Sequence, residues 1–104
     1  MALSEMTFYE RFEADILAGK KTITIRDKSA KNYSPNSIVQ ISTYETNRWF
    51  CALNIKTVEP ILFDGLTEFH AEQENMTLPQ LKNLIREIYL DEEDLYVISF
   101  ELIN

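Results

Sequence analysis

The amino-acid sequence predicts a single α+β domain over residues 1–104, whose strands curl into a small β-barrel flanked by α-helices. Three observations lead to this class. The chain has 104 residues, a length typical of one compact domain. Its hydrophobic content of 45%, with 12% aromatic residues, can furnish a core, and two glycines argue against a disordered chain. The expected elements follow the order helix, strand, strands, helices, strand.

The first expected element is a helix over residues 8–18. Residues 7–10 match a capping box, with Thr7 as N-cap and Glu10 at the third helical position. An apolar stripe with a spacing of four would form the buried face. It consists of Phe8, Phe12 and Ile16. Gly19 then favours the left-handed conformation that ends a helix.

A strand is predicted directly after this helix, because polar and apolar residues alternate from Thr22 to Arg26. Thr22, Thr24 and Arg26 share one face, and the two isoleucines between them point to the core. Hydroxyls and a guanidinium on one face, with lysines at the start of the strand, resemble a site. The segment alone favours a simpler interpretation, an edge strand with a solvated face.

The middle of the chain predicts a loop followed by a hairpin. Residues 27–37 are polar and form the loop, and strands are expected over residues 38–44 and 49–58 with a turn around Asn47. One face of the second strand is Cys51, Leu53, Ile55 and Thr57. Pro60 is expected to interrupt this strand, leaving residues 61–63 as a short edge strand.

The last third of the chain predicts two helices and a closing strand. Thr67 would cap a helix over residues 66–72, with Leu66, Phe69 and His70 facing inward. Residues 77–80 form a second capping box before a helix that ends near Tyr89. Its apolar face is Leu78, Leu81, Leu84, Ile85 and Ile88. Residues 96–102 read as a strand with alternating apolar residues.

Composition narrows the classes of function. The formal net charge of −7 favours a small, weakly charged ligand over a long phosphate backbone. Local contact with RNA stays open because several cations gather in one segment. They are Lys20, Lys21, Arg26, Lys28 and Lys31.

Several classes of protein are disfavoured. No apolar run approaches the ~20 residues of a membrane span, and acidic residues interrupt any signal-peptide pattern at the N-terminus. The single Cys51 excludes an internal disulfide and fits a cytoplasmic protein; we interpret it as a core residue. Cys51 and the single His70 lack metal-ligand spacing, so we expect no metal and no cofactor.

Two motifs resemble a known family. Gly19, Lys21 and Arg26 stand in a G-x-K-x-x-x-x-R pattern that resembles the hallmark of ASCH domains, small β-barrels related to the PUA fold of RNA-binding domains. Residues 7–27 and 70–78 are more specifically similar to the bacterial YqfB family of N(4)-acetylcytidine amidohydrolases. The resemblance covers essentially the whole chain. One departure is Asn36-Ser37, where related proteins often have Gly-Asp.

The resemblance implies a PUA-like β-barrel that hydrolyses N(4)-acetylcytidine to cytidine and acetate. It assigns the proton acceptor to Lys21, the nucleophile to Thr24 and the proton donor to Glu74. The local sequence offers Glu74 a simpler role, electrostatic stabilisation of the next helix N-terminus. Arg26 is our candidate for holding the pyrimidine or polarising a carbonyl, and a structural salt bridge is its alternative.

The chemistry sets conditions on these residues. Lysine accepts a proton only when neutral, so burial and positive neighbours must lower the pKa of Lys21. A nearby Glu74 predicts coupled titration of the two groups. In a straight strand Lys21 and Thr24 lie on opposite faces, about 10 Å apart. The chain must therefore turn near Lys20, or the strand must begin only at Thr22.

Two other classes of function compete with the hydrolase. An RNA-binding module would use the barrel cleft and the local lysines without chemistry, and its affinity would fall steeply with salt. A plain interaction domain would leave Lys21, Thr24 and Glu74 without a role. We favour the hydrolase, acting as a monomer on a small acetylated nucleoside and not at a membrane.

Overall fold

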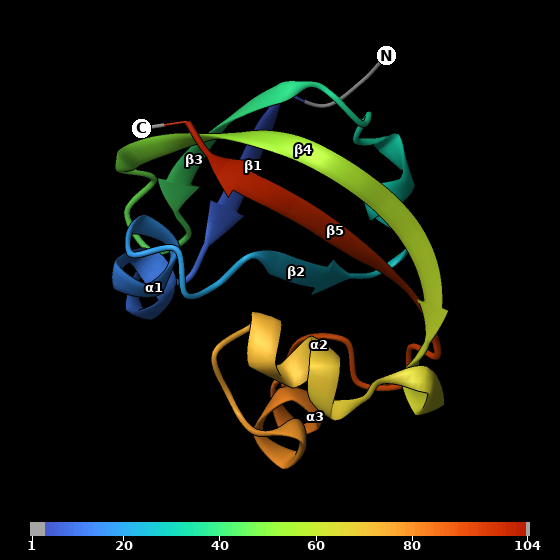
Figure 1. Cartoon of the computed structure of the whole chain (residues 1–104). Helices are drawn as coiled ribbons and strands as arrows, with labels where there is room; N and C mark the ends of the chain where they lie inside the picture. The colour runs from blue at the N-terminus through green and yellow to red at the C-terminus, as the bar shows by residue number, and fades with distance from the viewer. Residues whose placement is uncertain (1–3, 104) are drawn as a thin grey trace.

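The computed structural model describes residues 4–103, in which five strands form one curved sheet. The strands are β1 (Glu5–Phe8), β2 (Ile23–Arg26), β3 (Ile38–Thr43), β4 (Trp49–Leu62) and β5 (Asp94–Leu102). Their order is β1-β3-β4-β5-β2, with β1 parallel to β3 and every other neighbouring pair antiparallel. The long strands β4 and β5 bend together around the molecule (Figure 1).

The sheet is open, so the α+β class is confirmed but the closed barrel is not. β1 and β2 are the two edges of the sheet, and no ladder joins them in the part of the chain that the structure describes. Each edge strand has only four residues. A cavity lined by residues of both strands occupies the gap, and its lining supplies the candidate site below.

Helices cover this sheet at two places. The short 3-10 helix η1 (Glu10–Phe12) leads into α1 (Glu13–Leu17), and η2 (Lys28–Asn32) follows β2. The 3-10 helix η3 (Phe63–Gly65) ends β4 and precedes α2 (Glu68–Gln73) and α3 (Leu78–Ile88). These last two lie together at one end of the molecule, below β2 in Figure 1. Over residues 4–103, no helix combines the length and apolar character needed to cross a membrane.

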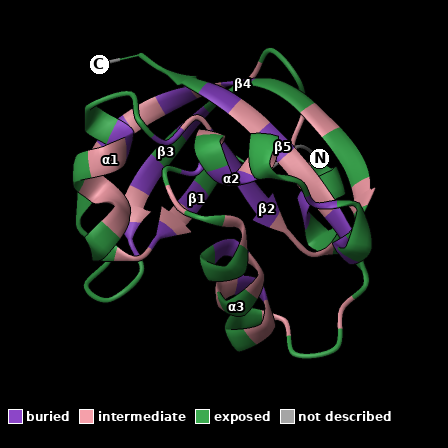
Figure 2. Ribbon diagram, turned by 60° about the horizontal axis from the view of Figure 1, so that its bottom comes forward, coloured by how far each residue is buried: buried purple, intermediate pink, exposed green. Residues whose placement is uncertain are grey.

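Strand β2 separates two apolar clusters. The first lies inside the curve of the sheet and includes Phe8, Ile16, Ile41, Leu53 and Phe100. The second joins β2 and β5 to the helices and includes Ile23, Ile25, Leu66, Leu81 and Ile85. Buried residues accordingly run along the strands, whereas the second half of β4 contains only exposed and intermediate residues (Figure 2). The predicted inward face of β2 is confirmed, since both of its isoleucines are buried.

The predicted helix over residues 8–18 is wrong in its first half. Thr7 and Phe8 belong to β1, so the expected capping box does not form, and the α-helix spans only Glu13–Leu17. The cause is non-local: β1 gains a parallel ladder with β3, which buries Phe8 in the first cluster. Gly19 does end the helical segment, with a φ of 75°.

The predicted interruption of β4 at Pro60 is also wrong. The strand runs to Leu62 and Pro60 pairs with Tyr96, because β3 pairs with β4 only as far as Asn54 and leaves this edge without a partner strand. A register shift between Ile55 and Thr57 also turns Thr57 to the outside, against our expectation.

Local rules predicted the remaining elements well. Asn47 adopts a φ of 55° in the hairpin turn, and both Thr67 and Thr77 form capping boxes. Phe69 is an exception, because it is 65% exposed while its neighbours Leu66 and Ala71 are buried.

Candidate active site

The approach to β2 is a tight turn. After Gly19, the amides of Lys20 and Lys21 both donate to the Asp15 carbonyl, at 2.9 and 3.1 Å. The amide of Thr22 donates to the Gln73 carbonyl at 2.8 Å, and the strand begins only at the next residue. The chain therefore does not run as a straight strand from Lys20. Such a strand would have placed Lys21 and Thr24 on opposite faces.

Lys21 and Thr24 line the same cavity, which has a volume of about 380 Å³. It lies where β1 and β2 face each other, and the end of α3 closes one side. Its polar lining includes Lys21, Thr24, Arg26 and Glu87. Its aromatic lining is Phe8, Tyr9, Phe12, Tyr44 and Tyr89. Such a cavity suits a flat ring that carries a few polar groups.

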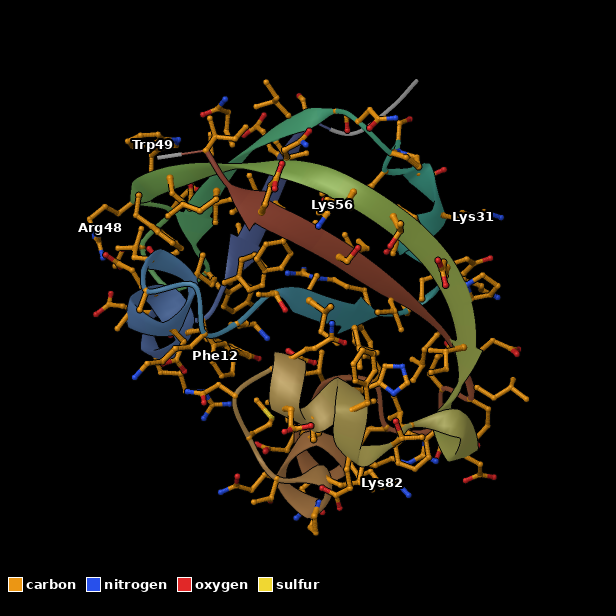
Figure 3. All side chains as sticks on the ribbon, viewed as in Figure 1. Phe12, Lys31, Arg48, Trp49, Lys56 and Lys82 are labelled. Atoms are coloured by element: carbon orange, nitrogen blue, oxygen red, sulfur yellow. The ribbon has the colours of Figure 1, made fainter. Side chains whose placement is uncertain are left out.

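Lys21 and Glu74 form a buried ion pair. Each residue is 3% exposed, and with Thr24 at 5% they make up three of the four buried polar residues in the described range. The ammonium also lies 4.9 Å from the centre of the Phe12 ring. Phe12 projects from the side of α1 that faces α2 and α3 (Figure 3). The lysine is thus buried against an aromatic ring and in direct contact with one carboxylate.

Glu74 is held by the end of α2. Its amide donates to the carbonyls of His70 and Ala71, both at 3.1 Å, and its side chain turns to Lys21. The lining of the cavity includes Lys21 but not Glu74, so this carboxylate meets the cavity only through the lysine. The side chain of Thr77 caps α3, as predicted, and the Glu74 carboxylate considered for electrostatic stabilisation of that helix contacts Lys21.

Burial lowers the pKa of Lys21 to about 7, and the positive charge of Arg26 adds to the effect while Asp15 opposes it. The lysine is therefore poised between its charged and neutral forms near neutral pH. An amine that is neutral near pH 7 meets the protonation condition that general-base catalysis sets, and Lys21 shares its cavity with the hydroxyl of Thr24.

Arg26 contacts the hydroxyl of Thr24 directly. Its Nε–H donates to Thr24 Oγ1 at 3.2 Å, and its Nη2 donates to the Thr7 carbonyl of β1 at 2.7 Å. The guanidinium carbon lies 4.8 Å from the centre of the Phe8 ring. Burial lowers the pKa of Arg26. The described residues give it no carboxylate partner, so the salt bridge considered from the sequence is not formed.

Other residues examined in the sequence lie outside this cavity. His70 Nδ1 belongs to the capping box of α2, where it accepts from the Thr67 amide at 3.1 Å. Cys51 is fully buried, and burial raises the pKa of its thiol to about 11, as is typical of a core residue. Over residues 4–103, the acidic, histidine and cysteine side chains form no group suited to a metal ion.

Four residues that line the cavity were not predicted from the sequence to be part of a site: Glu87, Tyr9, Tyr44 and Tyr89. Tyr9 was placed on a helix that does not form, and it lies 5.5 Å from the ring centre of Tyr44. Tyr44 and Tyr89 are the last residues of the expected strand and helix, and in the structure each directly follows the end of β3 or α3. Their position at the end of a strand and of a helix was the one signal for a functional role, because such ends often line a cavity.

Comparison with known proteins gives both close relatives and structural neighbours. No protein-family model matches the chain. The N(4)-acetylcytidine amidohydrolase of Vibrio atlanticus is 61% identical over 102 residues, 98% of each chain. The enzyme of the same name from Pasteurella multocida is 52% identical over 104 residues, the full length of both.

Solved structures show the same fold at much lower identity. The crystal structure of an ASCH domain from Lactobacillus crispatus has a TM-score of 0.76 at 16% identity, and the match covers 95% of this chain and 79% of that one. The ASCH protein of Zymomonas mobilis has a TM-score of 0.73 at 12% identity, with coverages of 94% and 68%. The open sheet with its flanking helices is thus the fold of ASCH domains.

Proposed function

The chain belongs to the family of N(4)-acetylcytidine amidohydrolases, and we propose that it hydrolyses the acetyl amide of N(4)-acetylcytidine to give cytidine and acetate. The observation that carries the proposal is a buried lysine with a pKa of about 7 in the same aromatic-lined cavity as a buried threonine. Lys21, Thr24 and Glu74 all belong to one chain, and we propose that the protein acts as a monomer.

The first step is attack by Thr24. Its Oγ1 forms a bond to the acetyl carbonyl carbon, and the hydroxyl proton moves to the neutral amine of Lys21. The carbonyl electron pair moves to oxygen and gives a tetrahedral intermediate. This step requires the unprotonated lysine, which the buried environment of Lys21 favours.

The second step releases the nucleoside. The C–N(4) bond breaks, the carbonyl reforms, and N(4) takes up a proton to leave as the cytosine amine. We assign the donor role to Glu74, whose contact with Lys21 gives the proton a route through Nζ into the cavity. Water then hydrolyses the threonyl ester: its oxygen bonds to the acetyl carbon, one of its protons returns to Glu74, and the proton held by Lys21 returns to Thr24 Oγ1. Acetic acid leaves and ionises to acetate, and both groups are reset.

The distribution of cations supports a small substrate. Lys21 and Arg26 turn into the cavity and do not add to a surface patch. Lys31, Lys56 and Lys82 come from η2, β4 and α3 and point away from one another (Figure 3). With a net charge of −7, this arrangement favours an uncharged nucleoside over an RNA strand. The RNA-binding module is thus the alternative outcome of the test.

The test is hydrolysis of N(4)-acetylcytidine, followed by loss of the acetylated chromophore. We expect turnover by the parent and a loss of about 10²–10⁴-fold in both Thr24→Ala and Lys21→Ala. Thr22→Ala is the matched control, because Thr22 lies outside the lining of the cavity, and it should keep the parent rate.

Two outcomes would change the proposal. Full activity in Thr24→Ala would keep the hydrolase but assign the attack to water. No turnover by folded parent protein would overturn the proposal and favour RNA binding, which a steep fall of affinity with salt would then identify.

A further inference from the structure

The Thr24 hydroxyl accepts a hydrogen bond from a group that can only donate. A hydroxyl has one proton and two acceptor positions, whereas a guanidinium has donors alone. Since Arg26 Nε–H donates to Thr24 Oγ1, the proton of that hydroxyl must point in another direction. Lys21, the proposed proton acceptor, lines the same cavity, as do Glu87 and three tyrosines.

We propose that Arg26 is a positioning residue, whose Nε–H fixes the Thr24 hydroxyl so that its proton points to Lys21 and its free lone pair points to the acetyl carbon. This inference rests on the proposed function and deepens it. A cationic donor on Oγ1 also stabilises the negative charge that develops as the proton leaves. Arg26 thereby acts through Thr24 and not as an anchor for the pyrimidine.

The guanidinium is held in place from both edges of the open sheet. Arg26 belongs to β2, and its Nη2 donates to the Thr7 carbonyl of β1 at 2.7 Å. The ring of Phe8 covers the guanidinium carbon at 4.8 Å. These contacts restrict the side chain in three directions, as accurate positioning of a reacting hydroxyl requires.

The charge of Arg26 has a second effect in the same cavity, since it lowers the pKa of Lys21. The other charged groups around this lysine come from several elements. They are Glu74 at the end of α2, Asp15 on α1, Glu87 on α3, which lines the substrate cavity, and Lys56 and Glu101 on β4 and β5, where a second cavity reaches Lys21. Arg26 is the cation that lines the substrate cavity beside Lys21. Removing its charge must therefore raise the pKa of the lysine.

The test compares Arg26→Lys with Arg26→Gln, because lysine keeps the charge but lacks the Nε–H fork. Arg48→Lys is the matched control, since Arg48 pairs with Glu13 at the outer side of the molecule (Figure 3). We expect both Arg26 variants to lose about 10- to 100-fold in kcat, with KM for N(4)-acetylcytidine near the parent value. The control should match the parent in both constants.

A second measurement, the titration of Lys21 by NMR, does not depend on enzymatic turnover. The ¹³Cε chemical shift of Lys21, assigned by its loss in Lys21→Arg, is followed against pH in each protein. The titration midpoint should rise in Arg26→Gln and stay near the parent value in Arg26→Lys. Parent protein without turnover would overturn the proposed function, and this titration would still test the role of Arg26.

Three results would overturn the inference. A raised KM with an unchanged kcat would make Arg26 a substrate anchor. An unchanged titration midpoint of Lys21 in Arg26→Gln would show that the charge of Arg26 does not lower the pKa of the lysine. Unfolding of both variants, seen by circular dichroism, would assign Arg26 to stability alone.

Discussion

Two kinds of ion pair occur in this molecule, and they differ in their surroundings. Arg48–Glu13 and Arg86–Glu93 each have an N···O distance of 2.5 Å and side chains that are between 23% and 54% exposed. Lys21–Glu74 joins residues 53 positions apart, and its side chains are only 2% and 4% exposed. The first two lie in water and are screened, whereas the third lies between the apolar clusters of the core.

The difference indicates why the buried pair exists. Exposed pairs contribute little to stability, because water already solvates both charges. A buried pair must also offset the desolvation of both charges, so an apolar pair of similar volume is often at least as stable. A gain in folding stability is therefore a poor explanation for the burial of Lys21 and Glu74. Chemistry explains them better, since burial is what brings the pKa of Lys21 to about 7.

The strongest way to test this contrast is to replace the buried pair as a whole. In Lys21→Met/Glu74→Leu, two side chains of similar volume would fill the space without charge. We expect hydrolysis of N(4)-acetylcytidine to fall by about 10²–10⁴-fold, because the base is lost. The free energy of unfolding, measured in urea, should stay equal to the parent or rise by about 1–4 kcal/mol.

The matched control for the double variant is Arg86→Met/Glu93→Leu, which removes an exposed pair from α3 and the loop before β5. It should keep its activity. Marked destabilisation of the Lys21→Met/Glu74→Leu protein would contradict the argument, because it would show that the buried pair is needed for folding.

The next largest effect is the pH dependence of stability. The pKa of Lys21 falls from 10.5 to about 7 in the folded protein. Between these values the unfolded chain binds the proton and the folded protein does not, so the free energy of unfolding rises as pH rises. We expect a contribution of about 1.4 kcal/mol per pH unit between pH 7 and 9, read as the difference between the parent and Lys21→Met.

Cys51 adds an opposite slope to both proteins above pH 9, and this slope cancels in their difference. Burial raises the pKa of its thiol from 9.0 to about 11, so above pH 9 the folded protein binds the extra proton and stability falls as pH rises. Equal pH slopes for the parent and Lys21→Met below pH 9 would show that Lys21 titrates normally, and it would then be too basic to deprotonate Thr24.

The sequence predicts the parts of this fold that local rules control. Gly19, Asn47 and the capping box of Thr77 all act within a few residues, and each behaves as expected. The failures arise where distant segments meet. A parallel ladder with β3 turns residues 5–8 into a strand, and a missing neighbour on one edge lets β4 continue through Pro60. Local periodicity contains no information about either contact.

The residues of the candidate site likewise fall into those that could be predicted from the sequence and those that depend on contacts between distant segments. The resemblance supplied Lys21, Thr24 and Glu74, and their catalytic roles remain predictions. Alternation along residues 22–26 predicted that Thr24 and Arg26 share a face, as the hydrogen bond between them requires. The tyrosines of the cavity were missed, because β1, the β3–β4 hairpin and α3 meet only in the folded chain.

The smallest expected effect concerns the exposed pair of α1. Glu13→Gln and Arg48→Gln each remove one partner of a pair that is already solvated, and the midpoint of thermal unfolding should stay at the parent value in both. Hydrolysis should also be unchanged, although α1 carries the Asp15 carbonyl that holds the amides of Lys20 and Lys21. Ile16, which is only 1% exposed, fixes α1 on the core. A clear loss of activity in either variant would mean that the surface pair positions α1, and the contrast between exposed and buried pairs would then fail.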